Sequence, residues 1–299
     1  MKRLLIGTIL ATFSLGACQT ARTQNNPQVV TTPLSETPSA TPVGDSTPAM
    51  EMTAPTATST PIPANAATVP AAPKLSYSSC HVQGPYIAMT FDDGPSAKDT
   101  PRLLDMLKAR NIKVTFFVLG EMVQQSPDLL KRMAAEGHEI ANHSWNHPQL
   151  TKLNAEGLRK QLGNTSDEIE QVTGKRPTLM RPPYGATNAA LTKTINEQYG
   201  MKVILWSVDP LDWKVRNADH VYSEIMKQTQ QGGIILSHDI HPTTVDAMPR
   251  TLDALLAKGY KFVTVSELIA MNREVPPAPK KEATPAPAKK AKENLASGR

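Results

Sequence analysis

Residues 87–95 have the sequence Ile-Ala-Met-Thr-Phe-Asp-Asp-Gly-Pro, an apolar run that ends in two carboxylates and a turn. A short apolar run bounded by turn-forming residues predicts a buried strand. The next residues form a helical pattern, with an expected cap near Asp99 and leucines at helical spacing. The stretch therefore predicts a strand followed directly by a helix.

The same alternation continues along the chain. Further strands are expected at 113–118, 139–142, 179–181, 202–206, 233–237 and 262–265. Helices are expected at 121–135, 154–173, 187–199, 217–231 and 244–258. This alternation indicates parallel strands joined by crossovers, so the predicted fold class is α/β with a barrel-like closure. Fewer than eight strong units fit in the length, and active sites of such barrels lie at the C-terminal ends of the strands.

The first 18 residues have the pattern of an export signal. Residues 1–17 combine the basic Lys2 and Arg3 with an apolar core at 4–15, which is too short to span a membrane. Leu-Gly-Ala-Cys at 15–18 resembles the lipobox of bacterial lipoproteins, in which the cysteine is acylated. The alternative is an ordinary cleaved signal with an incidental Cys18. Together with Gln19, the pattern predicts an exported protein anchored by lipid to the outer membrane, facing the periplasm.

Composition divides the rest of the chain into three parts. Residues 18–73 are rich in Pro, Thr and Ala and poor in large apolar residues, which predicts a disordered tether. Residues 74–274 form one predicted domain, and residues 275–299 a disordered tail rich in Lys, Pro and Ala. The tail has six basic and two acidic residues, whereas the domain has 23 basic and 22 acidic ones. A nearly neutral domain argues against a nucleic-acid partner.

Cys80 is the one cysteine besides Cys18. An exported chain with a single remaining thiol has no internal disulfide framework, so its stability must come from a hydrophobic core. A buried, inert thiol is expected at this position.

Chemically versatile side chains follow several of the predicted strands. Asp92 and Asp93 follow the first strand, and His143 and His147 have a spacing that suits two metal ligands on one helical turn. Adding a carboxylate gives a His-His-Asp set with open positions, as a catalytic metal needs. Arg181 precedes a proline, which favours an extended backbone there, although a surface arginine is the alternative. His238 ends an apolar strand, either as a proton donor or as a histidine at the rim.

Five ordered motifs extend these observations. The chain resembles the NodB-homology polysaccharide deacetylases, carbohydrate esterase family 4, over residues 84–270. The motifs that carry the resemblance are Thr90-Phe91-Asp92-Asp93-Gly94-Pro95, His143-Ser144-Trp145-Asn146-His147, Arg181-Pro182-Pro183-Tyr184, Asp209-Pro210-Leu211-Asp212-Trp213 and Leu236-Ser237-His238-Asp239.

The resemblance implies a distorted (β/α) barrel of about seven or eight strands and one divalent metal ion. Zinc is the expected ion, with cobalt or nickel as alternatives. The implied metal ligands are Asp93, His143 and His147. Asp92 is implied as the general base and His238 as the general acid that protonates the departing amine.

Supporting roles follow from the same resemblance. The backbone N–H of Tyr184 is expected to stabilise the oxyanion, and Tyr184 and Pro183 to contact the substrate. Arg181 is expected to orient Asp92 and keep it ionised. Asp212 is expected to orient His238, with Asp209 as the alternative.

An apolar pocket for the acetyl methyl is also implied. Trp206 and Leu236 are its expected walls, although Trp206 could equally fill the core. The other histidines are interpreted as ordinary surface or packing residues, with His241 close enough to border the cleft: His81, His138, His220 and His241.

The expected reaction is metal-dependent hydrolysis of N-acetyl groups from N-acetylglucosamine in an envelope polysaccharide, with peptidoglycan as the leading substrate. One alternative within the class is deacetylation of chitin oligomers or of an exported biofilm polysaccharide. Another is an esterase that removes O-acetyl groups from xylan. A non-catalytic lipoprotein that binds the wall is the alternative from another class.

Overall fold

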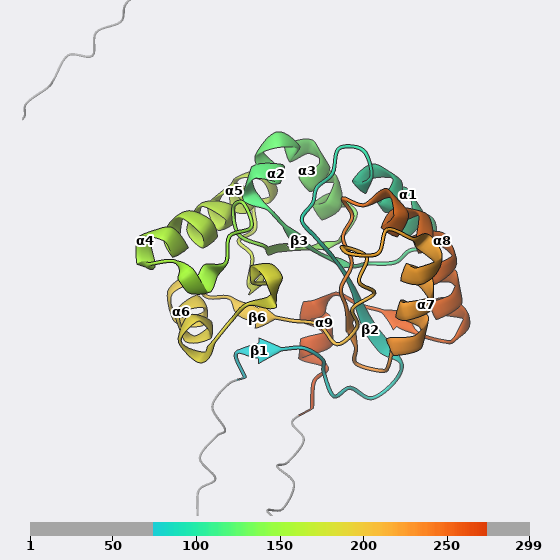
Figure 1. Ribbon diagram of the computed structural model, residues 1–299. Coiled ribbons are helices and arrows are strands. Elements are labelled where there is room, and N and C mark those ends of the chain that lie inside the picture. Colours follow the sequence, from blue (N-terminus) through green and yellow to red (C-terminus); the bar gives the residue numbers. More distant parts are fainter. Residues whose placement is uncertain (1–73, 274–299) are drawn as a thin grey trace, which may run out of the picture. The chain divides into compact units, whose positions relative to one another are not determined.

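The computed structural model describes residues 74–273 (Figure 1). The expected signal peptide, the acylation of Cys18, the tether at 18–73 and the tail at 275–299 lie outside the described residues. Within residues 74–273, no helix has the length and apolar character needed to cross a membrane.

Eight strands form the centre of the domain, and their neighbours pair in parallel. Their order is β1-β6-β5-β4-β3-β2-β7, and β8 pairs with β2. The predicted α/β class with parallel strands is confirmed. The strands are β1 (Ser76–Tyr77), β2 (Tyr86–Asp92), β3 (Thr115–Val118), β4 (Glu139–Asn142), β5 (Leu179–Met180), β6 (Lys202–Ile204), β7 (Ile234–Ile235) and β8 (Lys261–Phe262).

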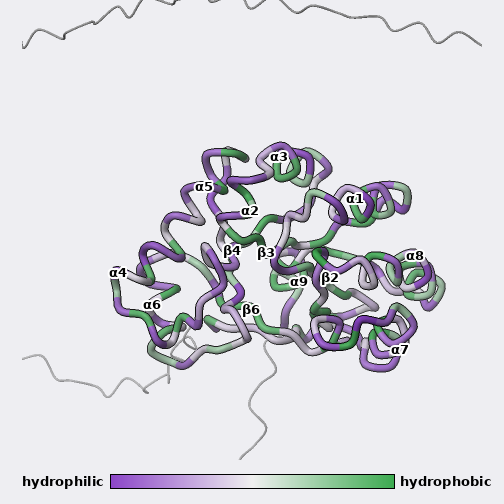
Figure 2. The backbone as a smooth tube through the Cα atoms, turned by 45° about the horizontal axis from the view of Figure 1, so that its top comes forward, coloured by the Kyte–Doolittle hydropathy of each residue, from purple (hydrophilic) through white to green (hydrophobic). Residues whose placement is uncertain are grey.

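Helices surround these strands (Figure 1). In Figure 2 the outer helices alternate between hydrophilic and hydrophobic residues, as helices that cover a core with one face do. The α-helices are α1 (Thr100–Ala109), α2 (Gly120–Gln125), α3 (Pro127–Ala135), α4 (Ala155–Leu158), α5 (Asn164–Thr173), α6 (Ala189–Tyr199), α7 (Ala218–Gln228), α8 (Pro242–Ala257) and α9 (Val265–Ala270). Short 3₁₀ turns lie at η1 (Leu150–Lys152) and η3 (Pro183–Gly185), and a π-helical turn at η2 (Arg159–Gly163).

Isolated bridges join the two edges of the sheet. Val208, beyond the end of β6, pairs in parallel with Ile235 of β7, and Ser79 pairs antiparallel with Gly233. Single bridges, and not a continuous ladder, therefore link the β1 and β6 side of the sheet to β7. The result agrees with the expected seven or eight strands and with a distorted closure.

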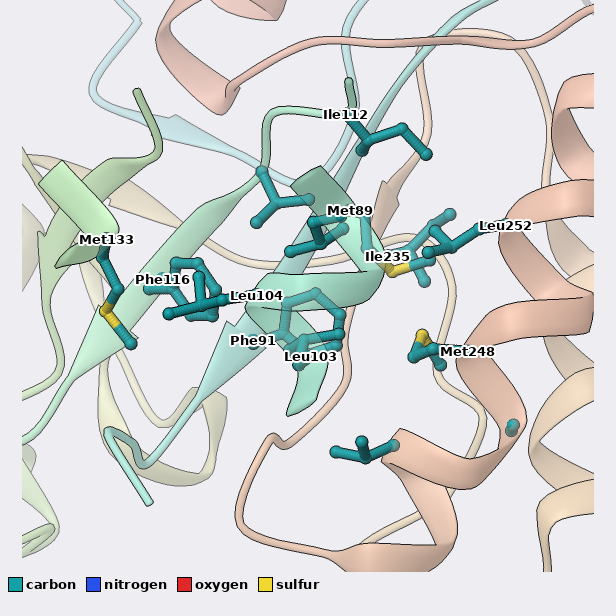
Figure 3. Packing of buried hydrophobic residues seen from close by; sticks show 14 of the residues in the cluster. Met89, Phe91, Leu103, Leu104, Ile112, Phe116, Met133, Ile235, Met248 and Leu252 are labelled. Carbon is teal, nitrogen blue, oxygen red and sulfur yellow. The ribbon is translucent and has the colours of Figure 1, made fainter. Parts of the chain in front are cut away.

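The period-two alternation of β2 sends its side chains to two different environments. Ile87, Met89 and Phe91 belong to the core between the sheet and the helices, where Phe91 stacks on Phe116 with ring centroids 5.6 Å apart (Figure 3). Thr90 points to the opposite face, where its hydroxyl donates to the Ile235 carbonyl at 2.6 Å. Asp92 shares that face and therefore reaches the open end of the barrel.

Three local features differ from the sequence-based expectations. The helix expected at 121–135 is two helices, because Pro127 restricts the residue before it and Ser126 adopts φ −138° and ψ 56°. The helix expected at 154–173 is interrupted by the π turn η2. The strand expected at 262–265 ends at Phe262, and α9 follows it with a capping box between Thr264 and Glu267.

Helix α9 covers the N-terminal ends of the central strands. The Val265 N–H donates to the Thr115 hydroxyl at 2.9 Å, and Thr115 is the first residue of β3. The two ends of the domain meet on this side, since the Arg273 N–H donates to the His81 carbonyl at 2.8 Å. In Figure 1, β1 and α9 lie side by side at the bottom of the view.

Candidate active site

A cavity of about 290 Å³ lies at the C-terminal ends of the strands. Asp92 ends β2, His143 follows β4 and His238 follows β7, so crossover topology brings together residues that are far apart in the sequence. Each of the five sequence motifs contributes two residues to its lining. The lining residues are Asp92, Asp93, His143, His147, Pro182, Tyr184, Gly185, Trp206, Asp209, Trp213, Leu236 and His238.

Three potential metal ligands converge in this cavity. One ligand atom from each of Asp93, His143 and His147 lies within 4.8 Å of the other two. The Asp93 Oδ1 atom is 3.4 Å from the His143 Nε2 atom and 3.7 Å from the His147 Nε2 atom. The structure thus brings together all three residues that were expected to bind metal.

The hydrogen bonding of these residues fits a divalent cation. The His143 Nδ1 atom lies 2.7 Å from the Arg181 carbonyl, which can only accept, so the proton is on Nδ1 and the Nε2 lone pair faces Asp93. The Asp93 Oδ1 atom is buried and has no hydrogen-bond partner among the described residues. A buried carboxylate oxygen that faces two imidazole nitrogens is the donor set of a metal site with open positions.

Electrostatics favours the ligand form of Asp93. Burial opposes ionisation of this carboxyl, but the close His143 side chain, 3.4 Å away, and the charges of His238 and His147 outweigh burial and lower its pKa. The pKa of His147 is lowered mainly by burial and then by His143, which favours the neutral imidazole that a metal requires.

The two histidines do not lie on a helical turn, so the helical interpretation of their spacing was wrong. Ser144 (φ 74°) and His147 (φ 63°) have left-handed backbones, which fold the segment into a loop after β4. Of the six non-glycine residues with positive φ in the described chain, Asn111 alone lies elsewhere: Asp93, Ser144, His147, Tyr184 and Leu211 all lie in the five motifs. Such strain persists only where the surroundings enforce it, and it gathers at functional sites.

Asp92 is paired with a buried arginine. The Arg181 Nη1 atom donates to Asp92 Oδ1 at 2.6 Å and to the Thr90 hydroxyl at 2.8 Å. Arg181 is fully buried, so the alternative of a surface arginine is excluded. Burial lowers the pKa of Arg181, opposed by the Asp92 charge, yet a guanidinium remains protonated in proteins.

Aromatic rings fix the position of this guanidinium. The Arg181 Cζ atom lies 4.1 Å from the ring centroid of Phe117 and 5.6 Å from that of Trp206. Its Nε and Nη2 atoms donate to the Ile204 and Leu205 carbonyls at 3.3 Å and 3.2 Å. These contacts leave Arg181 one orientation, in which it holds Asp92 at the edge of the cavity.

A second buried pair, His238 with Asp212, contributes to the site. The His238 Nδ1 atom lies 2.8 Å from Asp212 Oδ1, and the His238 N–H donates to Asp212 Oδ2 at 2.9 Å. Burial disfavours the imidazolium, but the hydrogen bond and charge of Asp212, with further charge from Asp92 and Asp93, raise the pKa of His238 to about 9. His238 is therefore protonated at neutral pH, and its Nδ1–H donates to Asp212 Oδ1.

The geometry decides between Asp209 and Asp212 as the partner of His238. Asp212 is fully buried and contacts His238 twice, whereas the Asp209 Oδ1 atom accepts from the Leu211 N–H at 2.8 Å. Asp209 thus shapes the turn that carries Asp212, and it also lines the cavity.

The expected substrate contacts are partly shifted. Tyr184 is 70% exposed, and its ring packs edge-on against His147 with centroids 4.5 Å apart. Pro183 is buried and does not line the cavity, whereas Pro182 does, because the left-handed backbone of Tyr184 (φ 61°) turns the chain at this point.

Trp206 and Leu236 both line the cavity, as expected of walls for a small apolar group. Gly185 is required beside them, because a Cβ atom there would lie 2.8 Å from the Trp206 Cη2 atom. Trp206 therefore lines the cavity and stacks near Arg181, instead of filling the core.

Sequence reasoning gave no role to several residues that build the site. Trp213 lies in a quoted motif and lines the cavity while 50% exposed. Thr244, which lies outside the five motifs, donates its hydroxyl to Asp212 Oδ2 at 2.7 Å. The fully buried Asp239 accepts from the Thr100 hydroxyl and packs on Gly94, where a Cβ atom would lie 2.4 Å from its Oδ1 atom. Burial raises the pKa of Asp239 to about 7, opposed by the Thr100 hydrogen bond.

The histidines outside the motifs do not line the cavity. His81 is exposed, and His138 is buried beside Phe116. His241 lies closest to the site, with its ring centroid 5.7 Å from that of His238.

The fold and site define an α/β protein with a His-His-Asp cluster beside a carboxylate and a protonated histidine. The model of the polysaccharide deacetylase family matches residues 81–204. A peptidoglycan-N-acetylglucosamine deacetylase of Bacillus cereus is 38% identical over 199 residues, which cover 64% of this chain and 72% of that protein. The chain belongs to the polysaccharide deacetylase family.

Other relatives show how far the similarity extends. The peptidoglycan-N-acetylglucosamine deacetylase PgdA of Listeria monocytogenes is 49% identical over 182 residues, 61% of this chain but 38% of that protein. The structure of peptidoglycan deacetylase PdaC from Bacillus subtilis has a TM-score of 0.60 and 46% identity, covering 63% of this chain and 92% of the solved one. The chain thus spans well under half the length of PgdA and most of the length of the solved PdaC chain.

Proposed function

We propose that this protein hydrolyses N-acetyl groups from N-acetylglucosamine residues of peptidoglycan in a metal-dependent reaction. The observation that carries the proposal is the arrangement of one cavity. It is lined by a carboxylate held by Arg181, a histidine held by Asp212 and three potential metal ligands. A base, an acid and an electrophilic site within one cavity are what amide hydrolysis requires.

The substrate assignment is supported by the names of the relatives. PgdA and the Bacillus cereus relative are named peptidoglycan-N-acetylglucosamine deacetylases, whereas PdaC is named a peptidoglycan-N-acetylmuramic acid deacetylase. Both names place the acetamide in the same polymer, and we assign this chain to the N-acetylglucosamine position.

Asp93, His143 and His147 would hold the metal ion. We propose zinc, because two imidazoles and one carboxylate with open positions match a catalytic zinc site, and cobalt or nickel also suit this donor set. When bound, such an ion supplies Lewis-acid chemistry, which polarises the acetyl carbonyl and acidifies water.

The chain's own groups perform the proton transfers. Asp92 is the general base that accepts the proton of the attacking water, in an orientation set by Arg181. The Tyr184 N–H stabilises the negative charge that develops on the carbonyl oxygen. His238 then donates its Nε2 proton to the departing nitrogen, while its Nδ1–H remains hydrogen-bonded to Asp212.

The acid distinguishes amide from ester chemistry. An amine is a very poor leaving group until it is protonated, whereas an alkoxide departs more easily. A histidine whose pKa is raised to about 9 stays protonated over the neutral range and so suits an amide substrate. Trp206 and Leu236 form the apolar wall for the acetyl methyl.

We also propose that the protein is exported and anchored through acylated Cys18 to the outer membrane, facing the periplasm. The sequence Leu-Gly-Ala-Cys at 15–18 supports this assignment. Metabolic labelling with a fatty-acid analogue tests it, with Cys18→Ser as the variant. Label on the wild type and none on the variant is expected, and equal labelling would contradict the assignment.

Acetate release by the full-length chain, purified in detergent, tests the proposed reaction. The substrates are peptidoglycan, N-acetylglucosamine oligomers and acetylated xylan, each with and without added zinc or cobalt. Release from peptidoglycan that requires metal is expected. Mass spectrometry of the digested product then shows whether N-acetylglucosamine or N-acetylmuramic acid lost its acetyl group.

His238→Gln is the informative variant, and His81→Gln is its matched control on an exposed histidine. The first should lose amide hydrolysis by a factor of about 10²–10⁴, and the second should behave as the wild type. Activity confined to xylan and insensitive to His238→Gln would identify an esterase instead. Wall binding without acetate release from any substrate would favour the binding lipoprotein.

A further inference from the structure

The loop that carries both histidines of the metal cluster requires support from outside itself. Ser144 and His147 hold positive φ values of 74° and 63°. A left-handed backbone is unfavourable for a non-glycine residue, because its Cβ atom comes too close to the following carbonyl oxygen. The loop keeps this conformation only if neighbouring groups form hydrogen bonds with its backbone that a relaxed conformation of the loop could not form.

One side of the loop is held by backbone groups at the start of α2. The Gly120 N–H donates to the Ser144 carbonyl at 3.1 Å, and the Glu121 N–H donates to the Trp145 carbonyl at 3.2 Å. Gly120 permits this approach, because a Cβ atom there would lie 2.3 Å from the Trp145 Cε3 atom. This side therefore holds the loop's carbonyls.

On its other side, the centre of the loop is held by the Gln161 side chain, while the Ser144 N–H donates to the Asn142 Oδ1 atom at 2.7 Å. The Gln161 Oε1 atom accepts from the Trp145 N–H at 2.8 Å and from the Asn146 N–H at 3.2 Å. Its Nε2 atom donates to the Asn146 Oδ1 atom at 2.8 Å. Gln161 thus binds the two residues at the centre of the loop, between His143 and His147.

The π-helical turn η2 places Gln161 against the loop. The Asn164 N–H donates to the Arg159 carbonyl five residues earlier, and Gln161 lies in the middle of this turn. Single π turns occur within α-helices frequently at functional sites. A second contact connects the turn to this loop, because Asn142, the residue before His143, donates from its Nδ2 atom to the Leu162 carbonyl at 2.9 Å.

We infer that Gln161 is a positioning residue of the metal site, which acts by holding the 143–147 loop so that His143 and His147 face Asp93. The inference rests on the proposed metal-dependent function. It assigns to Gln161 a contribution to metal affinity, although its side chain contacts none of the three ligand side chains. Residues that orient ligands from outside the coordination sphere typically contribute about 10–100-fold to metal affinity.

Zinc affinity of the full-length chain tests the inference, measured by competition with a chromophoric chelator. Gln161→Met keeps the length and helix propensity of the side chain but removes its amide. Its affinity for zinc should fall by about tenfold or more. Gln161→Glu retains the acceptor for both N–H groups, and Asn146 can turn its amide to donate, so most of the affinity should return.

Asn164→Met is the matched control, because it replaces an exposed amide just after the same turn. It should bind zinc as the wild type does, and thermal unfolding of the metal-free variants checks that each of them is folded at the temperature of the zinc titration. Wild-type affinity in Gln161→Met would overturn the inference and leave the proposed function intact. Equal weakening in Gln161→Glu or Asn164→Met would overturn it as well, since the helix and not the amide would then matter. A wild type that binds no zinc would instead refute the metal-dependent function itself.

Discussion

The cavity is flanked by two buried ion pairs of similar composition, Asp92 with Arg181 and Asp212 with His238. Each joins a carboxylate to a cationic side chain through a short hydrogen bond, 2.6 Å in the first pair and 2.8 Å in the second. In the first pair the carboxylate lines the cavity and the cation lies behind it. In the second pair the order is reversed, since His238 lines the cavity and Asp212 is behind it.

The difference shows that position and not residue type sets the chemical role. The member that faces the cavity can exchange a proton with a substrate, and the member behind it can only orient and stabilise charge. The pairs also differ in their response to pH, because the guanidinium of Arg181 does not deprotonate. The pKa of His238 is raised to about 9, so the cation of the second pair loses its charge within an accessible pH range.

Asp92→Asn should have the largest effect, because it removes the proposed general base at the cavity and keeps the shape of the side chain. We expect kcat for acetate release to fall by about 10²–10⁴. Zinc binding should persist, since Asp93, His143 and His147 are unchanged. The control is Asp128→Asn, an exposed carboxylate in α3. Loss of zinc together with activity would show that Asp92 is a ligand.

Arg181→Met should cost stability more than any change on the acid side. It leaves a buried carboxylate without its partner, a change that typically costs about 3–5 kcal/mol. Urea unfolding of the metal-free chain measures this cost. The double variant with Asp92→Asn should recover part of it, because no charge then remains unpaired. Equal costs in the single and double variants would argue against the pairing.

Asp212→Asn should weaken the acid without removing it. Loss of the carboxylate charge should lower the pKa of His238, and the alkaline limb of kcat/KM should move down by about 1–3 pH units. The pH profile of acetate release measures this shift. An unchanged alkaline limb would mean that another group is the acid.

The stability of the wild type should depend on pH for the same reason. The pKa of His238 is raised from 6.5 to about 9 on folding, so its contribution is complete below pH 6.5 and is lost as pH rises through about 9. Thermal unfolding of the metal-free wild type at about pH 6 and about pH 10 measures this loss, which should be smaller in Asp212→Asn. If the wild type lost no more thermal stability between these two pH values than Asp212→Asn does, the proposed contribution of His238 would be contradicted.

Thr244→Val should have the smallest effect, because it removes one of several hydrogen bonds to Asp212. We expect a loss of about 1–2 kcal/mol in the free energy of unfolding. The less stabilised Asp212 charge should favour protonated His238, so the alkaline limb should move slightly upward. A downward shift would contradict the proposed geometry. Thr243→Val is the neighbouring control.

Much of the site could be predicted from the sequence, because motif residues occupy strand ends. The topology of parallel strands places such ends at one edge, whatever the details of the crossovers. Asp93, His143 and His147 converge for that reason, although the helical interpretation of the spacing between the two histidines was wrong. The sequence pattern predicted which residues would lie at the site, but it did not predict the left-handed backbone that orients Asp93 and the histidine loop.

Other parts depend on contacts that no local pattern encodes. The alternation of β2 predicts which residues share a face, but not that Arg181 is fully buried beside Phe117. Thr244 acts through one hydrogen bond to Asp212, and Gln161 acts through three hydrogen bonds to Trp145 and Asn146 in another segment. The π turn that carries Gln161 cannot be told from α-helix in the hydrophobic pattern, because Leu158 and Leu162 are four residues apart, a spacing that suits either kind of turn.

The hydrogen bond between the Arg273 N–H and the His81 carbonyl has a practical consequence. Both ends of the described domain lie beside α9, at the N-terminal edge of the strands, whereas the cavity opens at the C-terminal edge. An affinity tag, a bead or a second protein domain attached at either end therefore sits away from the cavity mouth. A short peptide could even join the two ends and allow new termini in a surface loop, which makes this domain a good candidate for circular permutation.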